Sequence, residues 1–250
     1  MELQLAGKTA IVTGASRGLG RAIALALAGE GVGVLAVARN EDLLRSLAET
    51  SSGGTIYAAT ADMRDPEQVS ALPATALAAF GRLDIVVNNA GIAPARAFLD
   101  EEQSEWQEVF DVNVSAPAAL ARAAGRHMLA QGSGKVINIA SISGLLGKAS
   151  LVAYSASKGA LIQFTKALAS EWATSGVQVN AIAPGAFETE AQKAVLESPD
   201  LLKRRIRRIP ARRIAAPEEI GPLACYLASP VSDFVTGSVF VIDGGEASKL

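Results

Sequence analysis

The 250-residue chain is 50% hydrophobic, 19% charged and only 5% aromatic, which is typical of a compact globular protein. Its net charge of −2 argues against a general affinity for nucleic acids, so we expect no nucleic-acid partner. One cysteine and one histidine exclude an intramolecular disulfide and leave too few ligands for a Cys- or His-based site, so we expect no metal.

The sequence also gives no sign of a membrane or secretion segment. Its apolar runs fall short of the roughly 20 residues that a transmembrane helix needs. The N-terminal stretch lacks a basic segment followed by a long apolar one, which a secretion signal would show. We therefore expect a cytoplasmic protein without a membrane partner.

Short apolar runs bounded by turn residues recur along the chain. Runs without polar alternation predict strands that are buried on both faces, as in a parallel sheet. The predicted strands are 9–14, 33–38, 55–60, 84–90, 135–141, 177–184 and 238–243. The run at 55–60 is the weakest of them.

Segments with helical spacing of apolar residues separate these strands. They predict helices at 20–31, 40–50, 66–79, 101–130, 151–175 and 217–228, the second beginning at an Asn40 cap. Strands that alternate with helices indicate an α/β fold, a Rossmann-like doubly wound parallel seven-stranded sheet with helices on both faces. Since no linker, repeat or low-complexity stretch interrupts the pattern, we expect one domain over 1–250.

The stretch TGASRGLG at 13–20 joins the first strand to the first helix. Its glycines allow a tight turn in which backbone N–H groups approach a pyrophosphate at the helix N-terminus. The alternative is an ordinary glycine-rich turn between a strand and a helix. Its place after the first strand favours a dinucleotide site formed by Gly14, Ser16, Arg17, Gly18, Leu19 and Gly20.

The end of the second strand bears on which dinucleotide is bound. An NAD site would place an acidic residue there for the ribose 2′-hydroxyl, whereas this chain has Ala38 and Arg39. Arg39 and Arg17 could pair with a 2′-phosphate, so NADP(H) is favoured over NAD(H); the alternative is that both are solvated surface charges. After the third strand, Asp62 and the Met63 backbone could contact the adenine.

Several motifs together resemble the short-chain dehydrogenase/reductase family, in its single-domain branch of about the length of this chain. They are TGASRGLG, NNAG at 88–91, Asn113 in DVNVSAP, Ser141, YSASK at 154–158 and PGAFET at 184–189. Their order spans essentially the whole chain. The sequence is most similar to the family's 3-oxoacyl-[acyl-carrier-protein] reductases and gluconate-type ketoreductases.

The resemblance implies a catalytic tetrad of Asn113, Ser141, Tyr154 and Lys158. Tyr154 would be the proton donor in ketone reduction, and Lys158, one helical turn later, would lower its pKa by stabilising tyrosinate. Ser141 would hold the substrate oxygen, and Asn113 a water for proton relay. The alternatives are a strand-end cap for Ser141 and a helix-kink residue for Asn113.

Further cofactor and substrate contacts follow from the same resemblance. Ser143 would line the substrate pocket beside Ser141 and Tyr154, and Lys158 would also bind the nicotinamide ribose. The remaining cofactor residues would be Asn89, Ala90 and Gly91 along the adenine ribose, and Pro184, Gly185, Phe187 and Thr189 around the nicotinamide. Leu145, Leu151, Phe187 and Arg96 would add to a mixed pocket lining.

Residues 188–213 are expected to form a mobile lid over the site. Seven of the eleven residues 203–213 are basic, which indicates either a solvated helix face above packed Leu202, Ile206 and Ile209 or attraction of an anionic substrate. Carrier-protein reductases have basic residues where this chain has Gly132 and Ser175. Carrier protein and sugar acid therefore both stay open as substrate types.

The leading interpretation is an NADP(H)-dependent oxidoreductase that reversibly reduces a ketone, as a small-molecule substrate, to a secondary alcohol. A sugar-nucleotide epimerase or dehydratase would normally need an added C-terminal domain, and only about 60 residues follow PGAFET. A nucleotide-binding sensor without turnover is the other alternative, against which the intact tetrad speaks. The family resemblance also implies a homo-oligomer, most commonly a tetramer.

Overall fold

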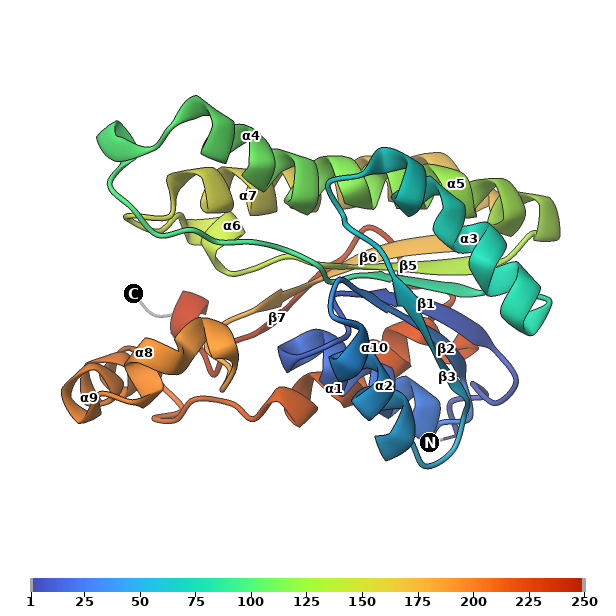
Figure 1. Ribbon diagram of the computed structural model, residues 1–250, viewed down its shortest axis with the longest axis horizontal. Helices are drawn as coiled ribbons and strands as arrows, with labels where there is room; N and C mark the ends of the chain where they lie inside the picture. Colours follow the sequence, from blue (N-terminus) through green and yellow to red (C-terminus); the bar gives the residue numbers. More distant parts are fainter. Residues whose placement is uncertain (1, 249–250) are drawn as a thin grey trace.

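The computed structural model describes residues 2–248, so positions 1, 249 and 250 of the expected domain lie outside the described residues. Seven parallel strands form one sheet in the order β3-β2-β1-β4-β5-β6-β7 (Figure 1). They are β1 Thr9–Thr13, β2 Gly33–Ala38, β3 Ile56–Thr60, β4 Ile85–Asn88, β5 Gly134–Ile139, β6 Val177–Pro184 and β7 Val239–Ile242. The predicted fold class is confirmed.

Helices cover both faces of this sheet (Figure 1). On one face, α1 (Gly18–Gly29), α2 (Glu41–Thr50) and α10 (Gly221–Ala228) share a core with the strands. On the other face lie α3 (Pro66–Phe80), α5 (Ala116–Gln131) and α7 (Val152–Trp172). The other α-helices of the described residues are α4 (Gln103–Phe110), α6 (Ser143–Leu146), α8 (Lys193–Leu196) and α9 (Pro199–Arg208).

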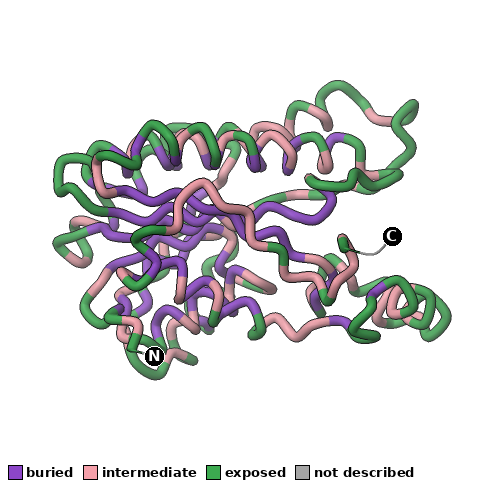
Figure 2. Tube along the Cα trace, turned by 180° about the vertical axis from the view of Figure 1, so that it is seen from behind, coloured by how far each residue is buried: buried purple, intermediate pink, exposed green. Residues whose placement is uncertain are grey.

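Burial of the strands explains how clearly each could be predicted. The central strands β1, β4, β5 and β6 are buried at every position (Figure 2), which is why they are continuous apolar runs. β3 lies at one edge of the sheet and is exposed at three of its five residues. Exposure of one face removes the need for apolar residues, so β3 has the weakest pattern.

The strand order places a ligand site. β1 has β2 on one side and β4 on the other, so the chain reverses its direction of winding at β1. In an open parallel sheet, the crevice for a ligand lies beyond the carboxyl ends of the strands at such a point. The glycine turn after β1 and the residues that follow β4 and β5 meet there.

The structure corrects one predicted helix. Residues 101–130 were expected to form a single helix, but α4 and α5 are separated by a π-helical segment at Asp111–Ser115. The expected cap of α2 is confirmed, since the Asn40 side chain accepts a hydrogen bond from the Leu43 N–H. Within the part of the chain that the structure describes, none of the helices is both long and apolar enough to cross a bilayer.

Candidate active site

The turn between β1 and α1 is packed tightly against the residues after β4. Gly14 has φ +66°, a left-handed conformation that favours glycine. A Cβ on Gly20 would lie 2.3 Å from the Gly14 carbonyl oxygen and 2.4 Å from Asn89 Nδ2. Asn89 donates from that amide to the Thr13 carbonyl at 2.8 Å. Asn89 therefore holds the turn in place from the segment that follows β4.

The N-terminus of α1 has the features of an anion site. Arg17 is the N-cap residue, and its side chain makes no capping hydrogen bond; the first turn also contains no acidic residue. The first N–H groups of the helix and its positive dipole end thus lack a side-chain acceptor, and a phosphate supplies one. The Arg17 guanidinium lies 3.9 Å from the Glu190 carboxylate in an exposed ion pair. Ser16 belongs to the same turn. The Leu19 side chain packs against the core.

A cavity of about 110 Å³ continues from this turn across the carboxyl ends of β2, β3 and β4. Among the predicted residues, Gly14, Arg39, Asp62, Met63, Ala90 and Gly91 line it. Arg39 is exposed at its edge. The cavity lining and the open helix terminus fit the adenosine and pyrophosphate parts of a dinucleotide.

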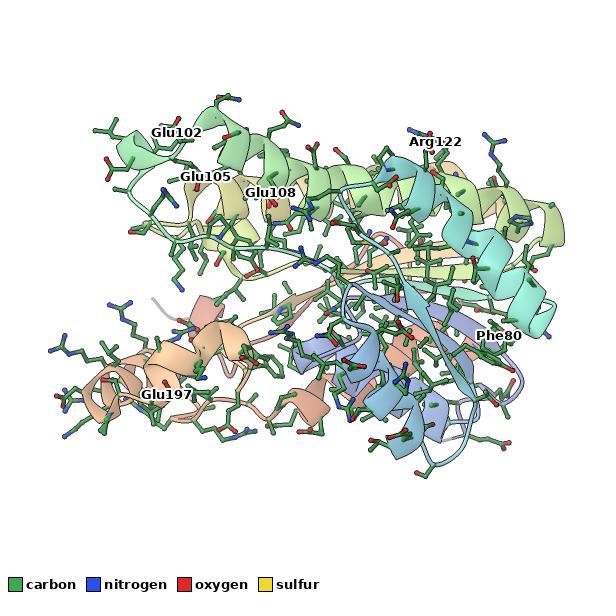
Figure 3. The ribbon with its side chains drawn as sticks, viewed as in Figure 1. Phe80, Glu102, Glu105, Glu108, Arg122 and Glu197 are labelled. Carbon is green, nitrogen blue, oxygen red and sulfur yellow. The ribbon has the colours of Figure 1, made fainter. Side chains whose placement is uncertain are left out.

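Sequence reasoning missed Arg64, Ile92, Glu108 and Val112, which also line the cavity. Arg64 donates to both carboxylate oxygens of Asp62 and to Glu108, and Glu108 projects from α4 (Figure 3). These hydrogen bonds, opposed by some desolvation, lower the pKa of Asp62 to about 2. That Arg64 lines the cavity could have been predicted from its place near Asp62 in the sequence. The position of Glu108 in the cavity depends on how α4 packs, which the sequence does not show.

Tyr154, Lys158 and Ser141 converge where β5 ends and α7 begins. Lys158 is 3% exposed, and its ammonium donates to the Ile139 carbonyl at 2.7 Å while lying 5.7 Å from the centre of the Tyr154 ring. Ser141 is also buried and is hydrogen-bonded to Tyr154. Tyr154 and Lys158, predicted on one face of a helix, are thus in contact with each other, and Tyr154 is in contact with Ser141, which was predicted at the end of a strand.

The predicted direction of the Tyr154 pKa is wrong for this geometry. Burial raises the pKa of the Tyr154 phenol, and the hydrogen bond with Ser141 offsets only part of that rise. Burial also lowers the pKa of Lys158 to about 8. At neutral pH the phenol therefore keeps its proton and Lys158 keeps its charge.

Asn113 lies in the π-helical segment and is fully buried. Its amide donates to the Ile92 carbonyl and to Ser157 Oγ, and its oxygen accepts from the Ile92 N–H. Both donors are occupied, so the side chain anchors the segment after β4 next to Lys158. The predicted relay water stays a prediction, as does the alternative of a helix-kink role for Asn113.

The segment 184–189 closes the site from the side of β6. Thr189 lies against the glycine turn, because a Cβ on Gly18 would be 3.4 Å from its methyl group. Gly185 donates from its backbone to the Ile242 carbonyl and leaves no room for a side chain beside Asp243. Pro184 is buried at the end of β6. The Phe187 side chain is buried in the core, so only its backbone can reach a ligand, and the predicted pocket lining by its ring is wrong.

The other predicted pocket residues differ in their burial and partners. Ser143 is buried and donates from its backbone to Ser141 Oγ. Leu145 is exposed on α6, and Arg96 is paired with Glu105 at 2.8 Å.

Residues 203–208 of the basic segment 203–213 belong to α9, and most of the basic side chains of the segment are exposed. Leu202, Ile206 and Ile209 belong to an apolar cluster with Ala186 and Ile214, as the packing interpretation predicted. Its arginines are in part neutralised, since Arg205 pairs with Glu246 and Arg213 with Glu219.

Comparisons with known proteins find matches that extend over almost the whole length of this chain. The family model described as Enoyl-(Acyl carrier protein) reductase matches residues 14–246. The chain is 41% identical to 2-dehydro-3-deoxy-D-gluconate 5-dehydrogenase of Bacillus subtilis, over 98% of this chain and 96% of that protein. It is 38% identical to 3-oxoacyl-[acyl-carrier-protein] reductase of Synechocystis, over 96% and 97%.

Solved structures show the same architecture. A gluconate 5-dehydrogenase from Burkholderia cenocepacia, in complex with NADP and tartrate, superposes with a TM-score of 0.94 at 35% identity, over 100% of this chain and 98% of that one.

Proposed function

Because the chain belongs to the short-chain dehydrogenase/reductase family and is an NAD(P)-dependent oxidoreductase, we propose that it reduces a ketone to a secondary alcohol with NADPH, reversibly. The observation that carries this proposal is the contact among Tyr154, Ser141 and Lys158 beside the dinucleotide cavity. The bound cofactor would supply the hydride.

The protein's own groups would handle the oxygen of the substrate. Ser141, at the end of β5, donates a hydrogen bond to the carbonyl oxygen, and Tyr154 transfers its proton to that oxygen as negative charge develops. Burial keeps the phenol protonated, which suits a proton donor. The buried Lys158 ammonium lies close by and stabilises the tyrosinate that forms.

Preference for NADPH over NADH is part of the proposal. The support is Arg39, exposed at the rim of the cavity, with no acidic side chain at residues 38–39. A 2′-phosphate would gain a guanidinium partner there.

Two substrate classes follow from the names of the relatives. One relative acts on a gluconate derivative and another is a reductase of carrier-bound 3-oxoacyl groups. Carrier-protein reductases have basic residues where this chain has the neutral Gly132 and Ser175. This difference favours the gluconate class as the substrate of this chain.

We expect the wild-type enzyme to oxidise NADPH faster than NADH across a panel of β-ketoesters, acyl thioesters, keto sugar acids and aryl ketones. Replacing Arg39 by Asp should reverse that preference by about tenfold or more, since one charged partner of the 2′-phosphate is exchanged for a repelling carboxylate. The ratio of kcat/KM for NADPH to that for NADH measures it.

The matched control is Arg122→Asp, which makes the same charge change on the exposed surface of α5 and should leave the ratio unchanged. An unaltered ratio in Arg39→Asp would contradict the phosphate assignment. NADPH binding without turnover of any ketone would instead support the nucleotide-sensing alternative.

The cytoplasmic location, the single domain, the mobile lid at 188–213 and the homotetramer stay predictions. Support for association of subunits is the edge strand β7, where Val241 is 44% exposed.

A further inference from the structure

A second cavity lies at the opposite edge of the sheet from the candidate active site. Its volume is about 380 Å³, within the range of about 300–1,000 Å³ that is usual for small-molecule pockets. It is bordered by the residues at which β5 and β6 begin, by those that precede β1 and β4, and by the segment 228–233 after α10. The candidate active site lies at the carboxyl ends of the strands, so the two cavities are separate.

Two polar side chains of the sheet lie side by side in this cavity. Lys135 of β5 and Gln178 of β6 are partners in the register of these neighbouring strands (Figure 1), so they project from the same face of the sheet. The Lys135 ammonium donates to Asp233 at 2.6 Å. Asn180, two residues after Gln178, donates to the Val235 carbonyl at 2.7 Å. Both side chains therefore point toward the segment between α10 and β7.

The Gln178 carboxamide is withdrawn from solvent without gaining a partner. Gln178 is 8% exposed, and its side chain has no hydrogen bond with any group of residues 2–248. Taking an amide out of water without replacing its hydrogen bonds is unfavourable. The small surface that Gln178 keeps opens into the cavity that it lines, so a molecule in the cavity can supply the missing partners.

The Lys135 ammonium also has bonding capacity left over. Of its three N–H donors, one binds Asp233 and one lies 3.4 Å from Ser232 Oγ. Burial lowers the pKa of Lys135, and the Asp233 carboxylate, which is itself largely exposed, offsets only part of that effect. A further negative partner would stabilise the buried ammonium.

The charged groups around the cavity favour a ligand with one negative charge. Lys8 lies 3.6 Å from the Asp84 carboxylate, and Arg82 donates to both oxygens of that carboxylate. Lys135 pairs with Asp233. Within these ion pairs, three cations share two carboxylates, so one additional carboxylate balances the charge.

We propose that this cavity binds a small hydroxy acid with a single carboxylate. One carboxylate oxygen accepts from the free Lys135 donor, and the other accepts from the Gln178 amide. The Gln178 oxygen accepts from a hydroxyl group of the same molecule. The proposal is independent of the proposed ketone reduction, because the residues assigned to the catalytic tetrad do not line this cavity.

Saturation-transfer NMR with two pairs of probes tests the site in the full-length protein. Each pair is a hydroxy acid and its uncharged counterpart: D-gluconate with D-glucitol, and 3-hydroxybutanoate with butane-1,3-diol. At least one acid should bind the wild type about tenfold or more tightly than its counterpart, because a charge-assisted hydrogen bond is gained. Equal binding within both pairs would overturn the proposal.

Two substitutions locate the bound acid. Gln178→Leu and Lys135→Met should each weaken binding of the acid by about tenfold to a hundredfold and leave NADPH binding unchanged. The matched controls are Gln103→Leu on α4 and Lys203→Met on α9, which make the same changes at exposed positions. The controls should bind the acid as the wild type does. An acid that binds both cavity variants with undiminished affinity lies elsewhere, and that result would overturn the assignment.

Urea unfolding separates a binding role of Gln178 from a structural one. Because its carboxamide has no partner within the described chain, Gln178→Leu without the acid should unfold at the same urea concentration as the wild type or a higher one. Adding the acid should raise the midpoint of the wild type and not that of the variant. A variant with a lowered midpoint would show that the carboxamide serves the fold, contrary to the proposal.

Discussion

At the scale of single residues, burial in the site disfavours the charged forms of both Lys158 and Tyr154. The Lys158 ammonium is buried and donates to the neutral Ile139 carbonyl, so its charge is costly and its pKa falls to about 8. The nearby phenol is also desolvated, and its pKa rises. Sequence reasoning anticipated the contact between the two residues but not these directions, since burial is a property of the folded chain.

The lowered pKa of Lys158 predicts a specific pH dependence of stability. Between pH 8 and the ordinary lysine pKa of 10.5, the unfolded chain binds more protons than the folded one, so the free energy of unfolding rises with pH. From pH 8 to 10, this rise should be about 2–3 kcal/mol, and below pH 8 it should vanish. Urea unfolding of the wild type and of Lys158→Met measures it as a growing difference between the two proteins. Parallel pH profiles would show that Lys158 titrates normally.

At the scale of elements, the turn between β1 and α1 depends on a glycine that lies inside the helix. Gly20 needs no unusual φ, but its Cα faces the Gly14 carbonyl and the Asn89 amide. A Cβ on Gly29, in the same helix, would meet no atom within 4 Å outside the helix's own backbone. The two positions therefore form a matched pair.

Replacing Gly20 by Ala should lower the free energy of unfolding by about 1–3 kcal/mol, because the new methyl group displaces backbone and amide atoms. It should also weaken NADPH binding by displacing the turn. Gly29→Ala should stabilise the protein by about 0.5 kcal/mol through helix propensity and leave NADPH binding intact. Urea unfolding and fluorescence titration with NADPH measure both effects; a Gly20→Ala protein as stable as Gly29→Ala would contradict the packing argument.

The π-helical segment is a feature of the structure that the pattern of apolar residues could not predict. Apolar spacing predicts one helix over 101–130, since a local change from α to π winding alters no composition. The π-helical segment is held by contacts in which Asn113 links Ile92 to Ser157. Such a side chain can be named from a motif, but its hydrogen-bond partners cannot.

At the scale of the whole molecule, the sheet could be predicted because burial on both faces demands continuous apolar strands. The motifs after β1, β4, β5 and β6 could then be placed together, since parallel strands end at one edge. What could not be predicted are contacts between segments far apart in sequence, such as Arg64 with Glu108 and Arg205 with Glu246. These depend on how loops and helices lie above that edge.

The proton transfer by Tyr154 is tested most directly by comparing Tyr154→Phe with the wild type in NADPH-dependent ketone reduction. The variant should bind NADPH as the wild type does and lose about 10²–10⁴ in kcat, because the proton donor is removed from a site that otherwise keeps its shape. Tyr57→Phe, which removes the same hydroxyl from an exposed position on β3, should keep full activity. A Tyr154→Phe enzyme that keeps most of its turnover would contradict the account.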